Sequence, residues 1–209
     1  MRIFFPLGVV LALVALAPAV AQEGRETGKA ADCAVETGPM LQLSPDAFDQ
    51  DMTGGWRNLA SRDGCAKAAA DLIRTYIDHN WGRIPQKNLH AMYWHAGQME
   101  ALAGDYQKAI PLLMAGVSPT ARGREMGFHD YAQGTIAFLN RDLAGLKAAR
   151  QRLSVLPEPA WFKTEFKDSS SITWPANLSI LDSLIRCFES PYAVAYAGIC
   201  PETDKEPPP

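Results

Sequence analysis

Apolar residues recur with the period of an α-helix through most of residues 51–200. The segment "GCAKAAADLIRTYIDHN" has an apolar helical face opposite a charged one, and the apolar face consists of Cys65, Ala69, Leu72, Ile73, Tyr76 and Ile77. The segment "PANLSILDSLIRCF" repeats this pattern, and in "SPYAVAYAGIC" Ser190 and Pro191 suit the start of a last short helix. No run of strand length alternates apolar and polar residues, so we expect an all-α fold.

The first residues, "MRIFFPLGVVLALVALAPAVAQ", resemble a secretory signal peptide. Arg2 precedes an apolar run from Ile3 to Ala17, and small residues at positions 19 and 21 suit a signal-peptidase site. The run is shorter than the roughly 20 residues that cross a bilayer. We therefore expect residues 1–21 to be removed, with no membrane insertion afterwards, and the mature protein to be periplasmic or secreted.

The rest of the chain divides by composition into three parts. Residues 22–50 are polar and lack periodicity, so we expect an extended lead-in there. Residues 51–200 are predicted to form one helical domain with a substantial core, and the proline-rich, charged tail 201–209 is predicted to be disordered. The formal net charge of -3 does not favour nucleic acid or an anionic membrane, since binding to either needs an excess of Lys and Arg.

The chain has four cysteines, Cys33, Cys65, Cys187 and Cys200. An even number after an export signal predicts two disulfides, because exported proteins enter an oxidising compartment. Three pairings are possible, and we favour Cys33–Cys65 with Cys187–Cys200, which would tie each end of the helical domain. No Cys-x-x-Cys pair occurs, so neither a zinc site nor a redox dithiol is indicated, and we expect no metal and no cofactor.

Two helical stripes meet in "HAMYWHAGQMEALAGDYQKAIPLL", residues 90–113. The first stripe contains Leu89, Met92, Tyr93, Ala96 and Met99. The second follows a turn at Gly104 and contains Tyr106, Ala109, Ile110, Leu113 and Val117. Two antiparallel helices joined by a tight turn would account for both stripes.

This predicted hairpin resembles the tetratricopeptide repeat (TPR), a helical hairpin of about 34 residues with small and aromatic residues at fixed places. The matching residues are Tyr93, Ala96, Gly97, Gly104, Tyr106, Ala109 and Leu113. A degenerate copy follows 37 residues later, with Gly134 in the place of Gly97 and Arg141 in the place of the turn glycine. A fainter copy includes Trp56, Leu59 and Ala60. The resemblance implies a short array of stacked antiparallel hairpins with disulfide-tied ends.

The resemblance also implies a function. In TPR proteins the first helix of each hairpin usually lines a concave groove that receives a peptide or a partner segment. By position, Trp94 and Gln98 would face that groove from the well-matched repeat, and Tyr131 and Thr135 from the degenerate one. We expect an exported binding or scaffold protein with a protein or peptide partner and with no catalytic residues.

The segment 156–175, "LPEPAWFKTEFKDSSSITWP", is long for a loop and holds Trp161, Phe162, Phe166 and Trp174. Long loops are often functional or disordered, and a disordered one would rarely carry four aromatic rings. Two alternatives stay open. The rings either fold back as a lid over the core or line a contact site.

Two other classes of function also stay open. An exported hydrolase would take its acid/base residues from His90, His95, Glu100 or His129, and its sign would be a histidine and a carboxylate meeting in a cleft, with a perturbed pKa. His90 and His95 lie about 140° apart around a helix, so they cannot bind one metal from the same face. A structural subunit of an envelope assembly would expose a large apolar patch at one end of the array.

Overall fold

The structure, a computed structural model, describes residues 32–117, 121–166 and 173–201. These residues are mostly helical and none of them lies in a β-strand, which confirms the expected all-α class. The predicted signal peptide, residues 1–21, lies outside the described residues, as do residues 22–31 and almost all of the tail 201–209. Among the described residues, no helix combines the length and the apolar character needed to cross a bilayer.

Four helices precede residue 80: α1 (Thr37–Leu41), α2 (Pro45–Asp49), α3 (Gly55–Ala60) and α4 (Ala66–His79). The first two correct the expectation of an extended segment over residues 22–50. Ser44 caps α2 by accepting a hydrogen bond from the Ala47 amide at 3.2 Å, and Pro45 occupies the first turn. Phe48 is fully buried and stacks on Tyr76 of α4, with 3.8 Å between the ring centroids. A local cap and tertiary packing therefore produce helices that periodicity does not predict.

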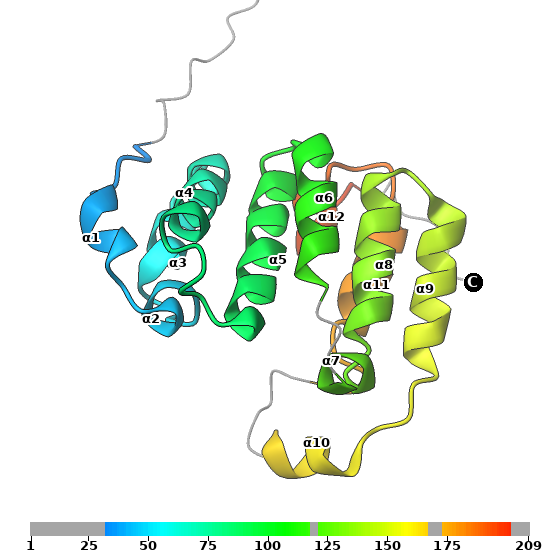
Figure 1. The fold of residues 1–209 in the computed structure, drawn as a ribbon. Coiled ribbons are helices and arrows are strands. Elements are labelled where there is room, and N and C mark those ends of the chain that lie inside the picture. Colours follow the sequence, from blue (N-terminus) through cyan, green and yellow to red (C-terminus); the bar gives the residue numbers. More distant parts are fainter. Residues whose placement is uncertain (1–31, 118–120, 167–172, 202–209) are drawn as a thin grey trace, which may run out of the picture. The chain divides into compact units, whose positions relative to one another are not determined.

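Eight more helices follow in the described part of the chain: α5 (Gln86–Leu102), α6 (Tyr106–Gly116), α7 (Ala121–Glu125), α8 (Phe128–Leu139), α9 (Leu143–Ser154), α10 (Ala160–Glu165), α11 (Leu178–Arg186) and α12 (Tyr192–Ala197). Helices α4, α5, α6, α8 and α9 each pack against the next one in this order (Figure 1). Helix α11 packs on α8 and α9, and α12 packs on α11 and α5. The C-terminal helices thus form a second layer behind this row.

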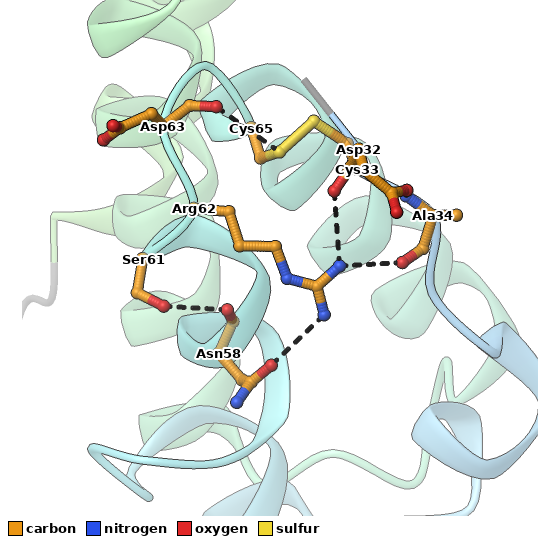
Figure 2. Close-up of a disulfide and its surroundings, with 8 residues drawn as sticks. All are labelled: Asp32, Cys33, Ala34, Asn58, Ser61, Arg62, Asp63 and Cys65. Carbon is orange, nitrogen blue, oxygen red and sulfur yellow. Dashed lines mark hydrogen bonds between the residues drawn. A yellow bond between two sulfur atoms is a disulfide. The ribbon is translucent and has the colours of Figure 1, made fainter. Parts of the chain in front are cut away.

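Both disulfides join the cysteines that we favoured from the sequence, Cys33–Cys65 and Cys187–Cys200. Beside the first disulfide, the Arg62 guanidinium donates to the carbonyl oxygens of both chain neighbours of Cys33, at 2.9 and 3.4 Å (Figure 2). The second disulfide joins the C-terminal end of α11 to the segment just after α12. Each end of the helical domain is therefore tied covalently.

Helix α5 separates two hydrophobic clusters. Met92 and Ala96 are fully buried with α4 and the N-terminal helices in the first cluster. Trp94 and Ala101 belong to the second cluster, with residues of α6, α8, α9, α11 and α12. The predicted stripe on α5 describes only its contact with the first cluster, because the helix is buried on two sides.

The hairpin turns α5–α6 and α8–α9 both contain a residue in the left-handed region. Gly104 has φ 85° in the first turn, and Arg141 has φ 60° in the second. A residue with a Cβ rarely adopts this conformation. The Arg141 side chain donates to the Phe188 carbonyl, pairs with Glu189 at 2.7 Å and lies over the Phe188 ring. Arg141 therefore links the α8–α9 turn to the chain that leaves α11.

Candidate partner-binding face

The four residues predicted to line a groove lie together between α5 and α8, and we call them the α5–α8 face. Trp94 and Gln98 are one turn apart on α5, and Tyr131 and Thr135 are one turn apart on α8. The ring centroids of Trp94 and Tyr131 are 5.4 Å apart. The Gln98 amide donates to the Tyr131 hydroxyl at 3.5 Å. Positions chosen from two segments predicted to be repeats therefore converge in space.

The chain's own C-terminal helix α12 lies beside Gln98 and Tyr131 of the α5–α8 face. Three of the four side chains of the face are at most 5% exposed, and only Gln98 is partly accessible. The Tyr192 amide, at the first residue of α12, donates to the Tyr106 hydroxyl at 2.7 Å, and α12 packs against α5. On the side where α12 lies, an external partner reaches Tyr131 only in place of α12, whereas Trp94 also packs against Phe128 of α8.

Hydroxyl groups gather between the α5–α8 face and α12. Burial raises the pKa of Tyr131, and the neighbouring Tyr192 and Tyr196 raise it further. Burial also raises the pKa of Tyr192, while the nearby Gln98 amide lowers it slightly. Within the described residues, the buried hydroxyls of Thr135 and Tyr192 have no hydrogen-bond partner of good geometry. Buried unpaired hydroxyls cost free energy, so the polar match between α12 and the face is incomplete.

The aromatic residues of 156–175 pack mainly on one another. Phe162 of α10 is 5% exposed, and its ring lies 5.0 Å from Phe166 and 4.9 Å from Trp174. The indole of Trp161 donates to a carboxylate of α7, and that of Trp174 to the Leu156 carbonyl, both at 3.0 Å. Phe162 belongs to neither of the two main hydrophobic clusters. The segment contains a short helix where we expected only a loop, and its rings form a small cluster of their own.

A second polar site lies where α2, α3 and α5 meet. The carboxylate of the fully buried Asp49 accepts hydrogen bonds from the Gln50 amide and, at 2.9 Å, from the Trp56 indole. The same carboxylate lies 2.7 Å from Nδ1 of His95. His95 was one of the candidate acid/base residues, whereas Asp49 was missed. The two are 46 residues apart, and no spacing rule connects positions so distant in the chain.

Electrostatics keep the Asp49 carboxylate charged. Burial is the largest single influence on the pKa of Asp49 and acts to raise it. The hydrogen bond and the charge of His95, together with the bonds from Trp56 and Gln50, outweigh burial, and the pKa of Asp49 is lowered. The charged carboxylate orients His95, whose side chain is 19% exposed and whose Nε2 has no protein partner among the described residues. A histidine held by a carboxylate at Nδ1, with Nε2 directed away from it, has the arrangement of a general acid/base pair.

The other candidate acid/base residues lie outside this site. Glu100 is fully buried and accepts a hydrogen bond from Arg74 at 3.2 Å, with the Lys67 ammonium 3.6 Å away. His90 lies 3.0 Å from a backbone carbonyl of α6. Neither His90 nor His129 pairs with a carboxylate in the part of the chain that the structure describes. In that part, no group of three or more His, Cys, Asp or Glu side chains is arranged to hold a metal.

Comparison of the chain with protein-family models, curated proteins and solved structures finds no match. The resemblance to the TPR therefore rests on the repeat residues themselves, above all those of 89–117, and it stays a prediction.

Proposed function

We propose that this protein is an exported, TPR-like binding protein that recognises a protein or peptide partner through the α5–α8 face. The convergence of Trp94, Gln98, Tyr131 and Thr135 between α5 and α8 carries the proposal. Helix α12 lies against Gln98 and Tyr131 of this face, which supports a helical segment as the kind of ligand. The two disulfides fit a periplasmic or extracellular protein, because disulfides persist in oxidising compartments.

The chemistry of the α5–α8 face suits recognition better than it suits plain core packing. Tyrosine and tryptophan combine a large apolar ring with a hydrogen-bonding group, and both are enriched where proteins bind one another. A core without a binding role would favour apolar residues at Gln98 and Thr135, since buried polar groups need partners. The hydroxyl of Thr135 lies near that of Tyr131 but forms no hydrogen bond of good geometry.

Site-specific photocrosslinking tests this proposal. A benzophenone amino acid replaces Gln98 at the accessible edge of the face, or replaces Gln151 on the exposed side of α9 as the matched control. Expressed in the native host and irradiated, the protein is expected to give a discrete adduct from position 98 and none from position 151. The adduct should be lost when Tyr131→Ala is added. Equal crosslinking at both positions, or none at either, would contradict the assignment of the face.

The Asp49–His95 site favours a second candidate function, an exported hydrolase. Asp49 would hold His95 so that Nε2 takes a proton from an attacking water. The exported chain is assayed against ester, peptide and glycan substrates, together with His95→Gln, Asp49→Asn and the control His90→Gln. Turnover that disappears in the first two variants and persists in the control would support this function. The candidate is removed if the wild-type chain turns over none of the substrates.

A further inference from the structure

We propose that α12 is an intramolecular ligand of the α5–α8 face, and that the external partner replaces it with a short helix of the same chemistry. That chemistry is two tyrosine-like side chains one turn apart, with a small residue directly before the second. This inference rests on the proposed binding function and specifies the class of partner.

The sequence and burial of α12 define the features that the face accepts. The helix reads "YAVAYA" from Tyr192 to Ala197. Tyr192 and Ala195 are at most 1% exposed and Tyr196 is partly buried, whereas positions 193 and 197 are exposed. Residues three and four apart share one side of a helix, so positions 192, 195 and 196 form its inner side. The Tyr192 ring lies 5.9 Å from Phe138 of α8.

Helix α12 depends on the residues packed around it for its structure. It has six residues, and isolated helices of this length are not stable in water. It starts directly after Pro191 and ends at Gly198, whose φ of 69° is left-handed, so both of its ends are sharply marked. The contacts with α11 and with the α5–α8 face, together with the Cys187–Cys200 disulfide, therefore maintain its conformation.

The chain before α12 is anchored independently of α12. Arg141 pairs with Glu189 at 2.7 Å and donates to the carbonyl of Phe188. These contacts hold the exit of α11 in place when α12 leaves. The Cys187–Cys200 disulfide keeps the departed segment close to the face. A tethered segment competes at a high effective concentration, so only a ligand that fits the same positions displaces it.

An external helix can bind the α5–α8 face more favourably than α12 does, because the hydrogen bonding between α12 and the face is incomplete. With α12 in place, the buried hydroxyls of Thr135 and Tyr192 lie near Tyr131 and Gln98, respectively, but form no hydrogen bond of good geometry. A ligand that supplies a hydrogen bond to Thr135 removes part of this cost. Neither α12 nor the four face residues carry a charge. Binding should therefore depend little on ionic strength, unlike recognition through ion pairs.

The test uses a fluorescein-labelled peptide of residues 189–199 and the full exported chain. In the variant Tyr192→Ala/Tyr196→Ala the anchors of α12 are removed, and fluorescence anisotropy is expected to show at least tenfold tighter peptide binding than in the wild-type chain. A peptide with both tyrosines replaced by alanine should not bind. The matched control chain, Ala193→Ser/Ala197→Ser, changes only the exposed side of α12 and should behave as wild type.

Hydrogen exchange on the unmodified chain gives a second measurement, which does not depend on the variant's folding. Excess peptide should accelerate exchange in α12 and leave α11 unchanged. The inference is overturned if a folded double variant binds the peptide no better than the wild-type chain does, or if excess peptide leaves exchange in α12 unchanged. If the peptide test fails but position 98 still gives a crosslink, the α5–α8 face remains the proposed binding site, and a partner helix that resembles α12 is excluded.

Discussion

Gly97 and Gly116 mark the places where α5 and α6 cross. A Cβ on Gly97 would lie 2.8 Å from the Leu113 amide nitrogen, and one on Gly116 would lie 2.5 Å from the Trp94 amide nitrogen. Side chains do not approach backbone atoms so closely without displacing them. Close packing between two helices therefore accounts for the small residues in this aromatic-rich stretch.

Gly97→Ala is expected to lower the free energy of unfolding by about 1–3 kcal/mol, because the new methyl group overpacks the crossing. The control Gly38→Ala lies in α1, where a Cβ meets no atom within 4 Å. This substitution should leave stability unchanged or raise it by up to about 1 kcal/mol, since alanine favours a helix over glycine. Urea unfolding followed by circular dichroism compares the two. Equal losses would show that Gly97 is not at a tight crossing.

Asp49 gives the stability of the protein a specific dependence on acid. Its native pKa is lowered, so its contribution is complete above the ordinary value of 3.8 and is lost as the pH falls through the lower native value. Asp49→Asn should flatten this acidic part of the stability curve. At neutral pH it should lower stability by about 1–3 kcal/mol, because the amide cannot satisfy all the donors. Urea titrations across the acidic range measure both effects. Parallel curves for the wild type and the variant would contradict a lowered pKa.

At the scale of elements, the short helices at the two ends depend on covalent ties. Helices α1 and α2 follow Cys33, whose disulfide spans 32 residues, and α12 precedes Cys200, whose disulfide spans 13. A longer closed loop restricts the unfolded chain more strongly. The tie at the N-terminal end should therefore stabilise the fold more than the other.

Replacing either disulfide by two serines is expected to cost about 2–4 kcal/mol, with the larger loss for Cys33→Ser/Cys65→Ser. Thermal unfolding in the absence of reductant measures the order of the two losses. As a control, the variant that lacks all four cysteines should unfold at the same temperature with and without reductant, because the reductant has no disulfide to act on. A larger loss of stability from Cys187→Ser/Cys200→Ser would mean that the native contacts of α12 affect stability more than the length of the closed loop does.

On the scale of the whole molecule, α5 couples the two hydrophobic clusters. Residues on one side of α5 are buried with α4, and residues on the other side are buried with α8 and α11. Neither cluster can lose α5 without exposing apolar surface in the other. We therefore expect the described domain to unfold in one cooperative transition.

Met92→Ala tests this coupling. Met92 is fully buried in the N-terminal cluster, and its truncation should cost about 2–5 kcal/mol. Hydrogen exchange should become faster in both α4 and α11, although α11 does not belong to the cluster that is changed. Met114→Ala, at a side chain that is 62% exposed, should leave exchange unaltered. An effect confined to α4 would show that the two clusters unfold independently.

The sequence by itself determined the helical class, the apolar face of α4, the α5–α6 hairpin and the favoured pairing of the cysteines. These features are local, because a period of 3.6 residues and small residues at a crossing are visible within one or two helices. The repeat positions also selected the four residues that converge on the α5–α8 face. The face of α4 and the hairpin needed only spacing along the chain, whereas the four face residues came from the resemblance to the TPR and the cysteine pairing was the favoured one of three.

Only the tertiary structure decided that α12 lies beside that face, that Asp49 meets His95, and that Phe48 brings α2 onto α4. Each of these contacts joins segments far apart in the sequence. Their residues satisfy no common period, because what determines such contacts is the burial of apolar surface and the pairing of buried polar groups after the helices have packed.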